Sequence, residues 1–363
     1  MRQLEVAIIG LGGMGRTTIE SLNEVDFISR IIGVDTQAEK SQSAKRDYGI
    51  DIYESLIDVW NDPNVELIYI TTPGAYHAQI AIEALKNGKK VMTEKPMGVN
   101  REETEQLLET VKQTNGFLQV GFECRNYSKL YLRIKEIIAS GEIGIPKHIT
   151  YCYVVSPYTT ENPSRDWKFS QDIAGGIFQE KLCHYIDLPR WWVGEKVCRY
   201  FCTKAPNIIP YYQIADNIEC TYQFQGGCVS QLTFMMGPAH GDNPNLMREI
   251  DIAEQKDQGY QLNYYIVGTE GALQASVFHR ELRVFYHQGK PGIKKSKMVR
   301  VECWERAEDH IYFHNTTEQN IDIARRAVLE QEPAIDPEDA AETMRLCYDF
   351  EDAVTKAWQI YER

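Results

Sequence analysis

The sequence lacks two features that are typical of secreted and membrane proteins: paired cysteines and a long hydrophobic run. Nine cysteines are scattered singly through 363 residues, and no C-x-x-C pair occurs, so neither a disulfide framework nor a zinc site is indicated. No apolar stretch approaches the roughly 18 residues that span a bilayer, and the opening Met1–Glu5 is too short and too acidic for a signal peptide. We expect a soluble, cytoplasmic protein with buried free thiols.

Positive charge is also scarce. Lys and Arg number 39 against 52 Asp and Glu, which gives a formal net charge of −13. Such an acidic chain repels phosphate backbones and anionic lipid, so we expect neither nucleic-acid nor membrane partners. Its hydrophobic content (43%) and charged content (25%) are those of a globular protein, and the length favours two domains.

The hydrophobic pattern changes between the two halves of the chain. The first 124 residues alternate continuous apolar strands with helix-like segments; the strands are at 6–9, 31–34, 67–70, 91–92 and 118–121. This predicts a doubly wound parallel sheet with helices on both faces. After about residue 145, two-residue alternation at 148–153, 218–224 and 228–234 predicts a large, mostly antiparallel, open-faced sheet with helices. We therefore predict an α/β domain over 1–124 and an α+β domain over 125–363.

The first strand leads into Gly10-Leu11-Gly12-Gly13-Met14-Gly15, which fits G-x-G-x-x-G and precedes a helix. In a Rossmann domain, such glycines allow a tight turn and let the backbone approach a pyrophosphate at the helix N-terminus. Asp35 ends the second strand, 20 residues beyond Gly15, where a carboxylate binds an adenosine ribose and repels a 2′-phosphate. The alternative is a purely structural glycine turn. The context favours NAD over NADP, although Lys40, Lys45 and Arg46 lie nearby.

Two further loops follow strands of the parallel sheet, where ligands bind in this architecture. Thr71-Thr72-Pro73 leads to His77, and Thr93 leads to Glu94-Lys95-Pro96. Two interpretations of His77 stand side by side: contact with the dinucleotide, or packing of the helix that it begins. A lysine held by the following proline suits a substrate hydroxyl or its oxyanion.

A helical pattern begins after Gly175-Gly176 and contains Glu180 and His184. The spacing i, i+4 on an α-helix places a carboxylate beside an imidazole, which orients the ring and favours a general base. His310 and His314 also have the i, i+4 spacing of a helical zinc pair, but the glutamate of H-E-x-x-H is absent, and we predict no metal.

In order and spacing, these motifs resemble the glucose–fructose oxidoreductase, inositol dehydrogenase and rhizopine-catabolism (Gfo/Idh/MocA) family. The resemblance continues through Val120-Gly121-Phe122-x-x-Arg125, His184-x-x-Asp187 and Gly268-Thr269-Glu270-Gly271, and so covers nearly the whole chain. It implies catalytic roles for Lys95, Glu180 and His184, with His184 taking the hydroxyl proton. The family usually carries aspartate at the position of Glu180, and its usual proline after Arg125 is missing.

The resemblance and the residue types together give the predicted ligand contacts. The cofactor-binding residues are Gly10, Leu11, Gly12, Gly13, Met14, Gly15, Asp35, Thr71, Thr72, Pro73, His77, Glu94 and Lys95. The substrate-binding residues are Lys95, Arg125, Asn126, Tyr153, Trp167, Lys168, Glu180, His184 and His310. Aromatic faces and polar tips suit a polyhydroxylated ring.

The leading hypothesis is an NAD-dependent oxidoreductase that acts on a secondary alcohol of a sugar, inositol or related polyol. Two alternatives are an NAD-dependent glycoside hydrolase that uses transient oxidation and a non-catalytic regulator that senses sugar or NAD. Since relatives commonly pair through the open sheet face, the resemblance also implies a homodimer or homotetramer.

Overall fold

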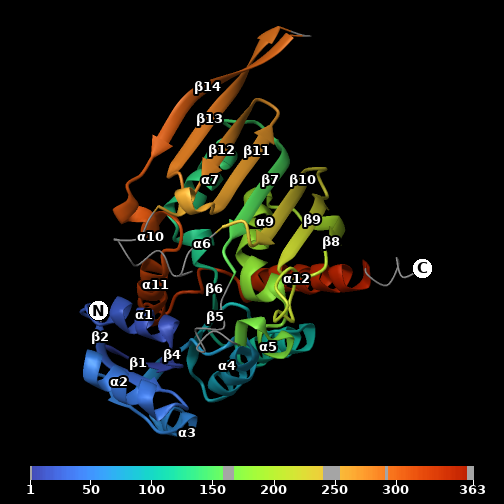
Figure 1. Cartoon of the computed structure of the whole chain (residues 1–363). Helices are drawn as coiled ribbons and strands as arrows, with labels where there is room; N and C mark the ends of the chain where they lie inside the picture. Colours follow the sequence, from blue (N-terminus) through green and yellow to red (C-terminus); the bar gives the residue numbers. More distant parts are fainter. Residues whose placement is uncertain (1, 158–166, 240–253, 291–292, 358–363) are drawn as a thin grey trace. The chain divides into compact units, whose positions relative to one another are not determined.

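The computed structural model describes residues 2–157, 167–239, 254–290 and 293–357, which form two compact units (Figure 1). Unit 1 draws on residues 1–127, 171–183 and 315–348. Unit 2 draws on the described residues within 128–170, 184–314 and 349–363. Each unit is built around one sheet.

Unit 1 contains a six-stranded parallel sheet in the order β3-β2-β1-β4-β5-β6. The strands are β1 (Leu4–Ile9), β2 (Ile28–Val34), β3 (Asp51–Ile52), β4 (Val65–Ile70), β5 (Lys90–Glu94) and β6 (Leu118–Gly121). Their continuous apolar runs are buried, as expected for a parallel sheet that is covered on both faces. From β1 the strand order extends to one side through β2 and β3 and to the other side through β4, β5 and β6. The loops after β1 and β4 therefore border the topological switch point, where ligands bind in such sheets.

Helices connect these strands. They are α1 (Gly13–Leu22), α2 (Ala38–Tyr48), α3 (Leu56–Asn61), the short turn η1 (Gly74–Tyr76), α4 (His77–Lys86), α5 (Arg101–Thr114) and α6 (Glu123–Asn126). Local sequence sets several of their ends. Asn100 caps α5 by accepting from the Glu103 N–H, and Ser55 forms a capping box with Asp58 at α3.

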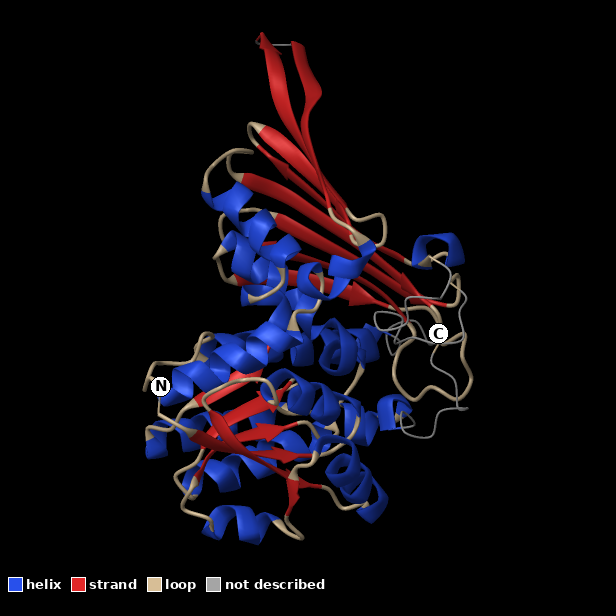
Figure 2. Cartoon of the chain, turned by 90° about the vertical axis from the view of Figure 1, so that its left-hand side faces the viewer, coloured by secondary structure: helices blue, strands red, loops and turns tan. Residues whose placement is uncertain are grey.

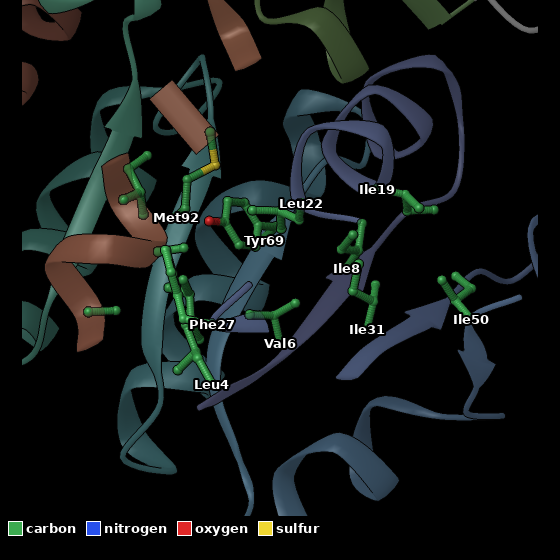
Figure 3. Packing of buried hydrophobic residues seen from close by; sticks show 14 of the residues in the cluster. Leu4, Val6, Ile8, Ile19, Leu22, Phe27, Ile31, Ile50, Tyr69 and Met92 are labelled. Carbon is green, nitrogen blue, oxygen red and sulfur yellow. The ribbon is translucent and has the colours of Figure 1, made fainter. Parts of the chain in front are cut away.

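A late segment of the chain completes the core of unit 1. Helix α11 (Thr316–Val328) places Ile323, Ala324 and Ala327 in one buried cluster with residues of β1, β2 and α1 (Figure 3). The buried Tyr69 hydroxyl of β4 donates to the Asn320 carbonyl at 2.7 Å. The sequence suggested a single division after residue 124. In the structure, residues 171–183 and 315–348 also belong to unit 1, because they pack against it.

Two other late segments belong wholly or partly to unit 1. The first comprises α8 (Gln171–Ala174) and the π-helical turn η3 (Phe178–Leu182). The second is α12 (Pro337–Ala357), whose residues up to Tyr348 lie in unit 1.

Unit 2 contains an eight-stranded sheet in the order β14-β13-β12-β11-β7-β10-β9-β8. Figure 2 shows these strands in red, side by side. They are β7 (Pro146–Val155), β8 (Val197–Thr203), β9 (Asn217–Phe224), β10 (Val229–Met236), β11 (Gln261–Gly268), β12 (Gly271–Ser276), β13 (Glu281–Lys290) and β14 (Ile293–Cys303). Neighbours run antiparallel except β7 and β10, which are parallel.

Helices α7 (Lys129–Ala139) and α9 (Cys183–Val193) cover one face of this sheet. Their aromatic side chains carry the packing, since Tyr131 and Trp192 both contact Tyr264 of β11 edge-on at 5.8 and 5.5 Å. The alternate side chains of β11 point the other way, and Tyr265 and Val267 are exposed. The remaining elements are η4 (Gln255–Gln258), η5 (Arg306–Glu308) and α10 (Asp309–Tyr312).

The predicted fold class is confirmed: a parallel Rossmann-type sheet precedes a mostly antiparallel mixed sheet with helices. All nine cysteines are free thiols. Of the helices in the described parts of the chain, none combines the length and apolar character needed to cross a lipid bilayer.

Helix α11 provides a test of unit 1. Replacing the fully buried Ile323 by Ala is expected to lower the free energy of unfolding by about 2–5 kcal/mol, because it leaves a cavity against the sheet. The control is Leu329→Ala just after the same helix, where the side chain is exposed and about 0.5 kcal/mol or less is expected. Urea unfolding of both variants measures the difference. Equal, small effects would contradict the packing of α11 in the core of unit 1.

Candidate active site

The glycine turn after β1 divides into positions that packing requires and positions that it leaves open. Gly10 has φ +96°, and a Cβ there would lie 2.9 Å from the Thr71 carbonyl carbon. A Cβ on Gly15 would lie 2.0 Å from the Gly10 oxygen. Around Gly12 and Gly13, by contrast, no atom of the described residues other than those of the adjoining backbone comes within 4 Å of an added Cβ. Gly10 and Gly15 therefore bring α1 onto the strand ends, while Gly12 and Gly13 leave bare backbone facing open space.

Asp35, directly after β2, is fixed beside this turn. Its Oδ2 accepts from the Leu11 N–H and its Oδ1 from the Gln37 N–H, both at 2.8 Å. The nearby Arg16 and Arg46 guanidinium groups both pair with Asp47. The Asp35 carboxylate thus stands at the end of the second strand, and the two guanidinium groups share a different carboxylate, that of Asp47.

These features fit a dinucleotide. No side chain of the described residues caps the start of α1, so its first N–H groups and positive dipole end are available to phosphates next to Gly12 and Gly13. Thr72 Oγ1 and Glu94 Oε1 are buried side-chain atoms that have no hydrogen-bond partner among the described residues. Gly12, Gly13 and the start of α1 would hold the pyrophosphate, and Asp35 would hold a ribose.

The loop after β4 joins this region through Thr71 and His77. The Thr71 hydroxyl donates to the Gly10 carbonyl at 2.6 Å. His77, the first residue of α4, is 1% exposed, with Nδ1 2.7 Å from the Pro96 oxygen and Nε2 2.7 Å from the Thr72 oxygen. Both ring nitrogens therefore contact carbonyl oxygens of the protein's own backbone.

Lys95 follows β5 and is half-buried. Its ammonium donates to the Glu180 backbone carbonyl. Burial on its own lowers the pKa of Lys95, but the thiol of Cys183 and the carboxyl groups of Glu180, Glu123 and Glu94 act the other way, and the net pKa is raised. Lys95 therefore remains a cation, which suits it to stabilise negative charge on an oxygen rather than to act as a base.

Glu94 precedes this lysine and behaves in the opposite way. Burial, followed by the nearby Glu123 carboxyl group, raises the pKa of Glu94 to about 8, although Lys95 partly offsets both. Glu94 is consequently protonated at neutral pH and has a hydrogen to donate.

The segment 171–183 reaches the Lys95 loop through a glycine. Gly175 has φ +83°, and a Cβ there would lie 2.6 Å from the Val99 carbonyl oxygen. Phe178–Leu182 then forms a π-helical turn rather than the regular α-helix expected from the sequence. Because π-helical bonds join i and i+5, the α-helical i, i+4 argument does not transfer directly to Glu180 and His184.

His184, the second residue of α9, belongs to unit 2 and is 5% exposed. Its ring lies 5.6 Å from that of His314, centroid to centroid. The predicted helix through His310 and His314 is wrong, because α10 ends at Tyr312. His310 is exposed, and His314 is the histidine of this pair that lies beside His184.

The other predicted substrate residues lie in varied surroundings. The Tyr153 ring is buried between Tyr185 and Phe234, at 4.9 and 5.7 Å. Lys168 lies over the Trp167 ring at 5.2 Å.

Arg125 and Asn126 turn toward the late segments of unit 1. Arg125 forms an ion pair with Asp339 of α12, and the Asn126 amide donates to the Ala334 carbonyl at 3.0 Å. Both residues therefore help to tie α6 to the C-terminal part of unit 1.

Comparison with known families decides the relationship. Residues 4–122 match the family model described as the oxidoreductase family with NAD-binding Rossmann fold, and residues 131–274 match the GFO/IDH/MocA C-terminal domain. The chain belongs to the Gfo/Idh/MocA oxidoreductase family. Its N-terminal part is an NAD-binding domain, and the chain is an NAD-dependent oxidoreductase, as the motifs predicted.

Individual relatives are distant. The uncharacterized oxidoreductase YrbE of Bacillus subtilis is 27% identical over 76% of this chain and 74% of its own length. The scyllo-inositol 2-dehydrogenase (NAD(+)) of the same organism is 27% identical over 75% and 73%. The crystal structure of scyllo-inositol dehydrogenase from Lactobacillus casei with bound NAD(H) and scyllo-inositol aligns with a TM-score of 0.76 at 18% identity and covers 98% of each chain. At that identity the structural match shows the shared fold.

The glycine turn gives a paired test. Gly12→Ala should leave the melting temperature unchanged, since a methyl group there meets no protein atom of the described residues, but it should weaken NAD binding at least about 10-fold by occupying the phosphate approach. Gly15→Ala should instead lower the melting temperature, because its methyl group collides with the Gly10 carbonyl. Calorimetry and thermal unfolding measure the two effects. Unchanged NAD affinity in Gly12→Ala would place the pyrophosphate elsewhere.

Proposed function

We propose that this chain is an NAD-dependent dehydrogenase that oxidises a secondary alcohol of a cyclic polyol of the inositol class. The observation that carries the proposal is the half-buried, charge-retaining Lys95 at the carboxyl edge of the nucleotide-binding sheet, where its ammonium donates to the Glu180 carbonyl. A fixed cation there suits an oxygen that gains negative charge as its carbon loses hydride. The scyllo-inositol 2-dehydrogenase relative supports the substrate class.

Lys95 would bind the reacting hydroxyl and stabilise the developing alkoxide. Its ammonium is already oriented by the Glu180 carbonyl, so little reorganisation accompanies the reaction. Glu94, which is neutral at pH 7, adds no full negative charge that would compete for this cation.

His184 would accept the hydroxyl proton, and Glu180 would orient the substrate or the imidazole. An imidazole ordinarily titrates near neutral pH and can therefore act as a general base. Lys95 cannot take this role, because it remains protonated. When bound, the nicotinamide supplies the hydride acceptor.

An uncharged substrate is consistent with the state of Arg125, whose positive charge is already paired within the protein. The Arg125 guanidinium, which could have served a substrate carboxylate or phosphate, already pairs with Asp339. The Lys168 ammonium lies over the Trp167 ring at 5.2 Å, and this pair would offer a polar and aromatic surface to a polyol.

The test is formation of reduced nicotinamide with NAD and a panel of inositols, sugars and polyols. We expect turnover with at least one inositol. Sugar release from glycosides without net NAD reduction would instead indicate glycoside cleavage. NAD binding without either reaction would favour a sensing role.

Single substitutions test the assigned residues. Lys95→Met should lower kcat about 10²–10³-fold and His184→Asn about 10²–10⁴-fold, with NAD affinity retained in both. Lys86→Met, an exposed lysine at the end of α4, is the matched control and should keep full activity. Near-normal kcat in both site variants would overturn the roles proposed for them.

We further propose that the exposed face of the eight-stranded sheet pairs with a second copy. Tyr265 and Val267 of β11 are more than two-fifths exposed there, and an apolar sheet face of this kind is typical of an interface. Light scattering should give a dimer or tetramer, and Tyr265→Glu with Val267→Glu should give a smaller species. A monomeric wild-type protein would contradict this assembly.

A further inference from the structure

The ring of His77 lies between two loops that the active site uses. One ring nitrogen faces the Thr72 carbonyl, in the loop that follows β4, and the other faces the Pro96 carbonyl, directly after Lys95. Both separations are 2.7 Å, and the ring is 1% exposed. Nothing else about α4 requires a histidine at its first position, since alanine or serine would begin the helix equally well.

The two partners fix the number of protons on the ring. A backbone carbonyl oxygen only accepts hydrogen bonds, whereas a neutral imidazole has one N–H and one bare lone pair. At 2.7 Å, a neutral ring would satisfy one carbonyl and press a lone pair against the other, in a place that water does not reach. An imidazolium donates to both.

The surrounding charges act in both directions. Burial is the largest influence on the pKa of His77 and lowers it, and the Lys95 ammonium lowers it further. The backbone carbonyls of Pro96, Thr72 and Glu94 oppose this lowering. Two further titratable side chains lie at the end of β5 and the start of α6: Glu94 and Glu123. Glu94 interacts electrostatically with both Glu123 and Lys95. The net result is a pKa of His77 below its ordinary value, with burial as the largest cause. The second proton is therefore inferred from geometry, because each of the two carbonyl oxygens at 2.7 Å requires a ring N–H.

We infer that His77 carries a proton on both ring nitrogens in the folded protein and is the positioning residue that fastens the Lys95 loop to the nucleotide loop. The Thr72 end of this link is itself tied to the glycine turn, since the neighbouring Thr71 donates to the Gly10 carbonyl. The Pro96 end is tied to α12, because the Tyr348 hydroxyl donates to the Gly98 carbonyl at 2.7 Å. His77 thereby sets where Lys95 stands relative to the dinucleotide.

This role explains why sequence reasoning left His77 undecided. A histidine at the start of a helix and close to a nucleotide loop suggests a ligand contact, yet both of its polar atoms are committed to protein carbonyls. Its influence on catalysis, which rests on the proposed function, passes through Lys95.

The proton count is tested without substrate or cofactor. In protein labelled with ¹⁵N-histidine, we expect one ring with two slowly exchanging N–H groups at neutral pH, and both signals should vanish in His77→Gln while persisting in the exposed His148→Gln control. A single N–H on the His77 ring at neutral pH would overturn the inference. If His77→Gln does not fold, the wild-type spectrum still shows whether a buried doubly protonated ring exists.

The positioning role is tested by splitting kcat from NAD affinity. His77→Gln keeps a donor toward one carbonyl only, so kcat should fall about 10- to 100-fold as Lys95 loses its placement, while the Kd for NAD changes little. His77→Phe, which has no donor, should fall further. If both variants keep the wild-type kcat, His77 is not a positioning residue. If the wild type itself lacks turnover, the proposed function fails while the spectral result stands.

Discussion

The close backbone approach at the carboxyl edge of the parallel sheet is the constraint on which this molecule depends. Gly15 passes so near Gly10 that a single methyl group would lie 2.0 Å from a carbonyl oxygen, and Gly10 in turn lies against Thr71. This contact brings the start of α1, the end of β1 and the loop after β4 to one place. The positive end of a helix and bare glycine backbone are then available to an anionic ligand, in a chain whose net charge is −13.

Next to this edge, Lys95 and Glu94 each have a defined protonation state. Lys95 keeps its proton because carboxyl groups and a thiol surround it, and Glu94 keeps its own because burial and Glu123 penalise the anion. A cation and a neutral carboxylic acid in sequence give two hydrogen-bond donors at adjacent positions. Donors held in place before the reaction are what a developing oxyanion requires.

Local sequence predicted the parts of the site that depend on local geometry. The glycine turn, Asp35 and the Lys95 loop each follow a strand, so their positions at one sheet edge follow from the alternation of strands and helices alone. The contributions of distant segments could not be predicted in this way. Nothing near Tyr69 indicates that its hydroxyl binds the Asn320 carbonyl, and nothing near Arg125 indicates Asp339 as its partner. Likewise, the π-helical turn before His184 and the early end of α10 depend on packing that a spacing rule does not contain.

The central claim, that this chain moves hydride from a polyol carbon to NAD, is tested most directly by isotope transfer in a single turnover. Enzyme loaded with NAD is mixed with myo- or scyllo-inositol deuterated at the ring carbons, and the nucleotide is recovered for mass spectrometry. The account predicts one deuterium in each reduced nicotinamide, and far less label when Lys95→Met is used. Bound NAD that gains no deuterium from either inositol would contradict it.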